Sequence, residues 1–214
     1  GFGTKNDSVV GFSPYLQYVL IFFMYLAGIN FSLHFFVLKR KFRLAFTNEE
    51  WKNYTFIILI TTLIIGVALF IAQDNSLEKS FRDSLFTVVS IITTTGFVSA
   101  DYLLWPQHTW IIILLLMFIG GSAGSTGGGV KVIRIVLLLK NSMLELKRLI
   151  HPQAIIPVRL NGRSVPQGII FNVLAFFLIY IIIFGIGSLI LSIIGLNFES
   201  SVGAVASALG NIGP

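Results

Sequence analysis

The stretch GGSAGSTGGGVK, residues 120–131, decides the fold of this chain. It interrupts an apolar run, because residues 110–119 are almost wholly hydrophobic and residues 130–139 are mostly so. Each glycine in a helix interior costs about 1 kcal/mol relative to alanine, and six glycines fall here. A spanning helix must therefore break inside the membrane, where lipid excludes irregular backbone. The break predicts a gate or a binding loop that is buried in protein or lines a watery cavity.

The composition is typical of a membrane protein. Of the 214 residues, 55% are hydrophobic and 11% are charged, whereas about 25% are charged in an average soluble domain. Four apolar stretches have roughly the 20 residues needed to cross about 30 Å of hydrocarbon. They are residues 15–38, 54–72, 110–139 and 169–194. We therefore predict an all-α membrane protein with several spans.

The positive charge follows the membrane topology. Much of the net charge of +6 lies between the first and second apolar stretches and between the third and fourth. These residues are Lys39, Arg40, Lys41, Arg43, Lys52, Lys140, Lys147, Arg148, Arg159 and Arg163. Basic loops face the cytoplasm, and anionic lipid is their ordinary partner. We expect a multi-pass protein of the cell (inner) membrane, with cytoplasmic basic linkers, a lipid bilayer around it and no nucleic-acid partner.

Several other classes are disfavoured by the motifs. The chain has no cysteine, no Ser-His-Asp arrangement and no metal-ligand spacing, so we expect neither an enzyme nor an organic cofactor. The glycine-rich stretch differs from a phosphate-binding loop, because Val130 and Val132 flank Lys131 where Gly and Ser/Thr are required. The chain begins Gly-Phe-Gly and ends Asn-Ile-Gly-Pro, which suggests a piece of a longer protein.

Two short segments, residues 80–93 and 200–209, repeat within the chain. Each follows a full span, is too short to cross the membrane and ends in a glycine-containing tetrad. Aligning Gly96 with Gly213 places the two tetrads, residues 94–97 and 211–214, in register. The pattern predicts two re-entrant helices that dip halfway into the membrane, with Ser80 and Ser200 as N-caps. Their partly negative C-terminal ends would then face a pore and favour a cation.

The tetrads have the chemistry of a cation filter. A dehydrated potassium ion needs a ring of oxygen ligands, and backbone carbonyls supply them where extended strands converge. Glycine permits the conformations that turn carbonyls inward, although a plain re-entrant turn with threonine caps is an alternative. The chain start GFGT resembles the sequence from Gly96 onward. The expected K⁺-binding residues are Gly1, Thr94, Thr95, Gly96, Phe97, Asn211, Ile212 and Gly213.

These segments together resemble one known family. ITTTGF at 92–97 resembles the third selectivity filter of the Trk/Ktr/HKT superfamily of potassium transporters. Residues 118–134 resemble the broken inner helix of that family's third repeat, and LGNIGP at 209–214 its fourth filter. Residues 27–35 are similar to the inner helix of the second repeat. LKRLIHP at 146–152 is similar to the linker of TrkH-type potassium uptake proteins.

The resemblance implies tandem repeats of span, re-entrant pore helix, filter and span (M1-P-M2) around a pseudo-fourfold pore. Residues 1–53 would hold the end of the second filter, the inner helix of repeat two and a cytoplasmic linker. Residues 54–150 would form the complete third repeat with its broken inner helix. Residues 151–214 would form a cytoplasmic linker and the first span, pore helix and filter of a truncated repeat four.

The implied function is potassium uptake through a backbone-carbonyl filter, with K⁺ as the transported ion. The resemblance also implies a homodimer and a cytoplasmic TrkA-type ring of nucleotide-binding domains. A secondary transporter whose discontinuous helices build a midplane substrate site is the alternative. The repeats enter from the same face, whereas such sites usually come from inverted repeats, so the channel-like interpretation is favoured.

The glycine-rich stretch is expected to be the gate just cytoplasmic of the filters. Its residues are Gly120, Gly121, Ser122, Ala123, Gly124, Ser125, Thr126, Gly127, Gly128, Gly129 and Lys131. A static kink that lets helices pack closely is the alternative. Lys131 and Arg134 would either face the ion path or snorkel to the interface, and the nearby sequence offers no obvious acidic partner. We interpret residues 47–50 as a purely structural capping box, and His34 as a packing residue.

Overall fold

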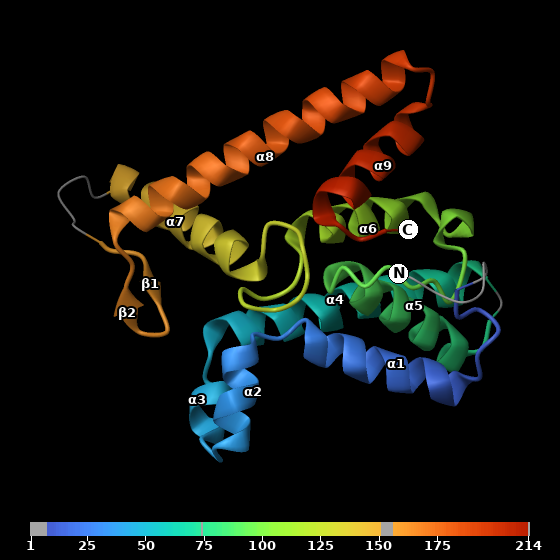
Figure 1. The fold of residues 1–214 in the computed structure, drawn as a ribbon, viewed down its shortest axis with the longest axis horizontal. Helices are drawn as coiled ribbons and strands as arrows, with labels where there is room; N and C mark the ends of the chain where they lie inside the picture. Colours follow the sequence, from blue (N-terminus) through green and yellow to red (C-terminus); the bar gives the residue numbers. More distant parts are fainter. Residues whose placement is uncertain (1–7, 74, 151–155, 214) are drawn as a thin grey trace.

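The computed structural model describes residues 8–73, 75–150 and 156–213 (Figure 1). Helices dominate it, joined by short turns and one two-stranded hairpin. In chain order the elements are α1 (Pro14–Ala27), α2 (Phe31–Leu38), α3 (Phe42–Phe46), α4 (Glu49–Ala72), α5 (Leu77–Ile92), η1 (Tyr102–Leu104), α6 (Gln107–Ile119), α7 (Val132–Ile150), β1 (Arg159–Leu160), β2 (Arg163–Ser164), α8 (Gln167–Ile193) and α9 (Phe198–Gly210).

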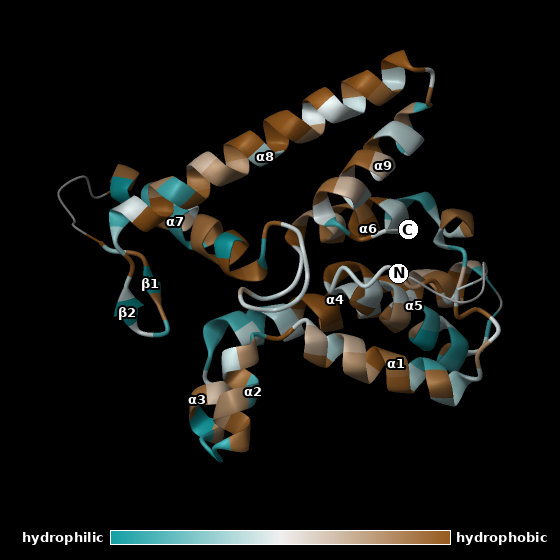
Figure 2. Ribbon diagram, in the orientation of Figure 1, coloured by the Kyte–Doolittle hydropathy of each residue, from teal (hydrophilic) through white to brown (hydrophobic). Residues whose placement is uncertain are grey.

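Within the described residues, two helices are individually long and apolar enough to cross a membrane: α4, with 24 residues, and α8, with 27. Both are hydrophobic along most of their length (Figure 2). The predicted first span is bent, because α1 and α2 meet at 99°. The Gly28 N–H closes the end of α1 on Met24 O, and the Asn30 side chain caps α2 by accepting the Ser32 N–H. The sequence interpretation of residues 15–38 as one apolar stretch gave no sign of this bend.

Each long helix packs along the short helix that follows it, α4 along α5 and α8 along α9. Small residues allow the close approach. A Cβ on Gly66 of α4 would lie 3.1 Å from Ser84 Oγ of α5, and a Cβ on Gly187 of α8 would lie 3.0 Å from Val205 Cγ1 of α9. Glycine at such positions lets membrane helices come together. The two pairs share the predicted order of a long apolar helix followed by a short one.

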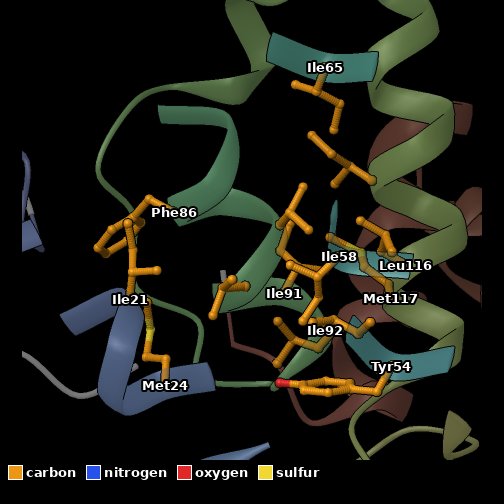
Figure 3. Close-up of a cluster of buried hydrophobic side chains, with 14 of the residues drawn as sticks. Ile21, Met24, Tyr54, Ile58, Ile65, Phe86, Ile91, Ile92, Leu116 and Met117 are labelled. Atoms are coloured by element: carbon orange, nitrogen blue, oxygen red, sulfur yellow. The ribbon is translucent and has the colours of Figure 1, made fainter. Parts of the chain in front are cut away.

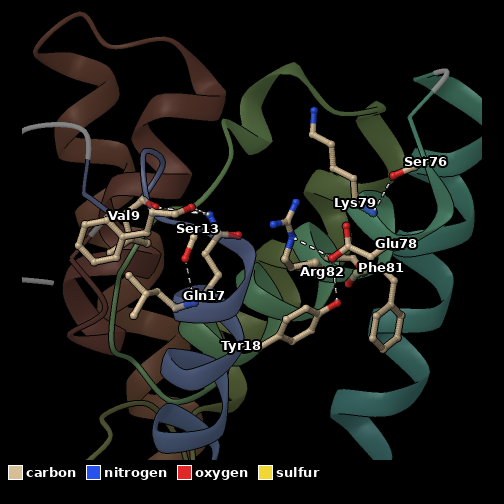
Figure 4. A network of polar contacts seen from close by, with 12 residues as sticks. Val9, Ser13, Gln17, Tyr18, Ser76, Glu78, Lys79, Phe81 and Arg82 are labelled. Carbon is tan, nitrogen blue, oxygen red and sulfur yellow. Dashed lines mark hydrogen bonds and ion pairs between the residues drawn. The ribbon is translucent and has the colours of Figure 1, made fainter.

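The two short helices begin earlier than predicted. Ser76 caps α5 by accepting the Lys79 N–H at 3.2 Å (Figure 4), and Asn197 caps α9 by accepting the Ser200 N–H at 2.8 Å. The assignment of Ser80 and Ser200 as N-caps is therefore wrong. A short polar side chain just before a helix satisfies an otherwise unpaired N–H, and residues 76 and 197 are the ones that stand there.

The short helix α5 lies in the middle of the hydrophobic core (Figure 3). Its Phe86, Ile91 and Ile92 are each 2% exposed or less and pack with side chains of α1, α4 and α6. The partners include Ile21, Met24, Tyr54, Ile58, Ile65, Leu116 and Met117. A helix enclosed in this way holds its C-terminal end, and the turn after it, at a fixed place inside the protein.

A polar network ties α1 to the first turns of α5 (Figure 4). The Tyr18 hydroxyl donates to Glu78 Oε1 at 3.2 Å, and Arg82 Nε lies 3.4 Å from the same oxygen. In the first turn of α1, the Gln17 side chain donates to the carbonyl of Phe12, which precedes the helix, at 3.3 Å. This end of the bundle is therefore fixed by side chains, independently of the apolar core.

The linker between α7 and α8 contains a β-hairpin that the sequence interpretation missed. β1 and β2 pair antiparallel, with Arg159 opposite Ser164. Asn161 and Gly162 turn between them with φ of 50° and 77°. An Asn-Gly pair with both φ angles positive is the preferred two-residue hairpin turn. The signal was present in the sequence, but the flanking strands are only two residues long.

Candidate functional site

The turns after α5 and α9 have the same backbone geometry. Thr94 and Asn211 are both left-handed, with φ of 57° and 54°. The Thr94 N–H donates to Ile91 O at 3.0 Å, and the Asn211 N–H donates to Ala208 O at 3.1 Å. Each helix therefore ends in the same left-handed turn, 117 residues apart in the chain.

The correspondence continues through the next residues of each tetrad. The Thr95 N–H donates to Ser90 O at 2.9 Å, and the Ile212 N–H donates to Ser207 O at 3.0 Å. Gly96 and Gly213 follow with φ of 71° and 101°, a region that glycine enters without steric cost. The alignment of Gly96 with Gly213 is thus confirmed by backbone geometry. Both segments of the chain leave the helical path at this point.

Side chains of α5 and α9 hold the tetrads in place. Ser90 Oγ donates to Phe97 O at 2.7 Å, and Ser207 Oγ accepts the Gly213 N–H at 3.2 Å. Farther along, the Val98 N–H donates to Ser8 Oγ at 3.1 Å. Of the predicted ligand set, Gly1 lies outside the described residues.

The glycine-rich loop leaves the path of α6 and returns to nearly the same point. Gly120 ends α6 with a φ of 74°. The Val130 N–H donates to Phe118 O at 3.1 Å and the Lys131 N–H to Ile119 O at 2.7 Å. The helix break predicted at residues 120–131 is confirmed, and the loop is an excursion from an otherwise continuous path (Figure 1).

One side of the loop fits into the bend between α1 and α2. The Ser122 N–H donates to Gly28 O at 2.9 Å, and the Phe31 N–H donates to Gly124 O at 3.2 Å. Helix ends leave backbone groups unpaired, and in lipid every such group must find a partner inside the protein. The two broken helices therefore satisfy each other's exposed backbone groups.

The other side of the loop lies against both tetrad turns. The Gly128 N–H donates to Thr94 Oγ1 at 2.8 Å, and a Cβ on Gly127 would lie 2.9 Å from Thr93 O. A Cβ on Gly128 would overlap the Gly210 carbonyl oxygen. Only residues without a side chain fit between these turns, so the predicted gate and the two predicted filters meet at Gly128.

A buried carboxylate at the start of α4 also binds the loop. Glu50 is 5% exposed, and its Oε1 accepts the Ala123 N–H. Asn48 caps α4 by accepting the Trp51 N–H at 3.0 Å, whereas Thr47 Oγ1 donates to Arg43 O at 2.6 Å. The segment therefore caps the helix, but not through the predicted box of Thr47 and Glu50. Glu50 instead binds the backbone of the loop, a structural contact with residues far away in the sequence that the predicted box did not include.

The two basic residues after the loop are held by protein groups. The Lys131 ammonium donates to the carbonyl of Gly127 and interacts electrostatically with Glu50, the acidic partner that the local sequence did not reveal. Arg134 lies 4.0 Å from the centre of the Phe176 ring and donates to Val130 O at 3.3 Å. Lys131 therefore has a partner within the loop and an acidic group on α4.

The single histidine of α2 has a packing role, as predicted. His34 Nε2 lies 2.9 Å from Leu26 O, across the bend between α1 and α2, and its ring is 5.9 Å from that of Phe31. The contact bridges a carbonyl near the end of one helix to a side chain of the next. It stabilises the bend into which the loop fits.

The comparison with known proteins now decides the family. The family model for TrkH, described as a cation transport protein, matches residues 1–214. The chain belongs to the TrkH family. The Trk system potassium uptake protein TrkH of Escherichia coli K12 is 36% identical over 219 residues, and that of Halomonas elongata is 35% identical over 216 residues. TrkG of Escherichia coli K12 is 32% identical over 215 residues.

A solved TrkH structure has the same fold. The crystal structure of the potassium transporter TrkH from Vibrio parahaemolyticus matches with a TM-score of 0.91 and 34% identity, covering 100% of this chain and 47% of that one. The TrkH alignments from Escherichia coli and Halomonas elongata cover 100% of this chain and 45% of each relative, and the TrkG alignment covers 44% of TrkG. The chain thus spans less than half the length of the relatives it matches.

The predicted family and the all-α membrane fold are confirmed by these matches. The relatives are named as transport proteins, in agreement with the prediction that the chain is not an enzyme. The ligand set, the gating role of the loop and the division into repeats stay predictions, because none of them is part of what the family match establishes.

Proposed function

We propose that the TrkH-family protein containing this chain takes up potassium through a backbone-carbonyl filter. The observation that carries the proposal is the repeated turn geometry at residues 94–96 and 211–213, with equivalent φ angles and hydrogen bonds. Relatives along the whole chain are named potassium uptake proteins, so K⁺ is the proposed ion. The remaining repeats would come from parts of the protein outside this chain.

The proposed ligands are main-chain oxygens of the tetrads, and the side chains hold these tetrads in shape. Thr93 Oγ1 donates to Val89 O at 2.7 Å and lies 2.8 Å from Thr95 Oγ1, so both hydroxyls are engaged with protein. Rings of carbonyls replace the water shell of a dehydrated ion. The C-terminal ends of α5 and α9 add the negative end of a helix dipole at the same place.

The loop at residues 120–131 is the proposed gate on the inner side of the filter. It contacts the turn after α5 through Thr94 and approaches the end of α9 at Gly210. A kink that served helix packing alone would need no contact with both turns. In the conformation described here the loop lies directly under them, which favours a closed state that opens when the loop moves aside.

The distribution of charge supports an inner-membrane protein with its basic linkers in the cytoplasm. The basic segment after α2 and the β1–β2 hairpin lie toward the same side of the molecule (Figure 1). We propose that this face meets a TrkA-type nucleotide-binding ring and that the protein forms a homodimer, as its resemblance to the Trk superfamily implies. Pull-down of the full-length protein with such a ring tests the first partner, and its mass in detergent tests the dimer.

The experiment for the function is rubidium uptake by proteoliposomes that contain the full-length protein. Excess external K⁺ should abolish the uptake and excess Na⁺ should reduce it less. Gly96→Ala should lower uptake and weaken this discrimination, because Gly96 has a φ of 71° that side chains disfavour. Gly203→Ala is the matched control, since a Cβ there meets nothing within 4 Å in the part of the chain that the structure describes. Absence of K⁺-sensitive uptake in the unmodified protein refutes the proposal.

A further inference from the structure

Two consecutive carboxylates at the start of α4 bind two different parts of the protein. Glu49 faces the cytoplasmic hairpin, where it forms a reciprocal pair with the turn residue Asn161. The Asn161 N–H donates to Glu49 Oε1 at 2.9 Å, and the Glu49 N–H donates to Asn161 Oδ1 at 2.8 Å. Lys140 of α7 pairs with the second Glu49 oxygen and also donates to Arg159 O at 2.9 Å. Glu49 therefore joins α4, α7 and the hairpin.

Glu50 faces in the opposite sense, toward the intramembrane loop. Its carboxylate accepts the Ala123 N–H and also interacts with the side chain of Asn30, the backbone of Ile133 and the charge of Lys131. A buried charge is stable only while such partners are in place. Any movement of Glu50 relative to the loop therefore removes stabilisation from the loop conformation described here.

The two carboxylates cannot move independently, because they are adjacent residues in the first turn of one helix. Docking of the hairpin fixes Glu49, and the backbone of α4 transmits that constraint to Glu50. The hairpin itself is exposed at Arg159, Asn161 and Arg163, so a force applied from outside the membrane can reach it. The connection from this exposed turn to the buried loop runs through two residues.

We propose that Glu49 and Glu50 form a coupling junction between the β1–β2 hairpin and loop 120–131. While the hairpin is docked on α4, the junction holds the loop against the turns at Thr94 and Gly210; displacement of the hairpin releases it. Both glutamates are positioning residues that act through the loop. The inference rests on the proposed gating function and adds the route by which a cytoplasmic event reaches the gate.

The test uses the full-length protein in proteoliposomes and reads loop position separately from transport. Ser122 is 1% exposed, so Ser122→Cys, in a background free of other cysteines, reports release of the loop through its modification by a membrane-impermeant thiol reagent. Rubidium uptake is the second readout. Glu50→Ala removes the acceptor for the loop, Glu50→Gln keeps an acceptor oxygen, and Asn161→Gly removes the side-chain partner of Glu49 while tolerating the positive φ.

Glu50→Ala should raise both the modification rate and the basal uptake about tenfold or more, the change expected when a hydrogen bond to a charged group is lost. Glu50→Gln should restore part of the difference, which a general loss of folding would not allow. Asn161→Gly should raise both readouts in the same direction. Combined with Glu50→Ala it should add little, because the two changes interrupt one route.

Glu145→Gln is the matched control. It neutralises a carboxylate of α7 that lies outside the junction and pairs with Arg148, and it should leave both readouts unchanged. The proposal is overturned if Asn161→Gly leaves thiol modification at the parent rate, or if its effect and that of Glu50→Ala multiply independently. If all variants and the parent lack uptake, the proposed function fails, while the modification rates still decide whether the junction exists.

Discussion

Substitution of one glycine in the loop tests whether its described position is the closed state. In Gly128→Ala the new Cβ would overlap the carbonyl oxygen of Gly210 and lie 3.2 Å from Asn211 Cβ. The clash is with backbone at the end of α9, which cannot rotate away as a flexible side chain would. The loop must therefore leave its place between the two turns or force them apart.

The size of the effect follows from the cost of overpacking. An extra carbon forced into a well-packed site costs about 1–3 kcal/mol. With about 1.4 kcal/mol for each factor of ten, the equilibrium between the described loop position and a displaced one shifts about 5- to 150-fold. If the described position blocks ions, uptake in the absence of a cytoplasmic regulator rises by a comparable factor until another step becomes limiting.

The assay is rubidium uptake by proteoliposomes with equal amounts of full-length parent and variant protein. Gly185→Ala is the control, because Gly185 lies within α8 and a Cβ there meets nothing within 4 Å among the described residues. The control should behave like the parent. Unchanged uptake and unchanged dependence on the regulator in Gly128→Ala, at normal protein levels, would refute the gate and favour a static kink.

Three further predictions follow from single contacts. Thr94→Val removes the acceptor of the Gly128 N–H and should raise regulator-free uptake about fivefold, the equivalent of about 1 kcal/mol for one hydrogen bond; lower uptake would contradict this. Gly28→Ala places a Cβ against the Tyr54 hydroxyl and should destabilise the protein by about 1–3 kcal/mol, seen as a lower melting temperature that Tyr54→Phe partly restores. Asn197→Ala removes the cap of α9 and should lower the free energy of unfolding by about 1 kcal/mol in the same melting experiment. Asn197→Ser keeps a capping oxygen and should lose less stability, so an equal loss in the two variants would count against the cap.

Hydropathy and glycine content were enough to predict the main features of the fold. The long apolar runs became α4 and α8, and the glycine-rich stretch became a break because helix propensity fails there regardless of tertiary context. The repeat was detectable because Gly96 and Gly213 both need positive φ, a requirement that a sequence displays directly. These features depend on local chemistry.

The missed features depend on contacts between distant segments. The bend at Gly28–Asn30 exists where the loop from residues 120–131 supplies partners for the broken backbone, and the first apolar run gives no sign of that loop. Glu50 resembled an ordinary residue of a helix start, since the N-terminal turn favours acidic groups. Its role became visible only when the structure placed Ala123 beside it.

The most direct measurement of the central claim is the position of bound rubidium, a stand-in for K⁺, in crystals of the full-length protein by anomalous diffraction. The account predicts a peak on one axis that main-chain oxygens of residues 94–96 and 211–213 surround. A rubidium peak coordinated elsewhere, or tetrad carbonyls that point away from any shared axis, would contradict it.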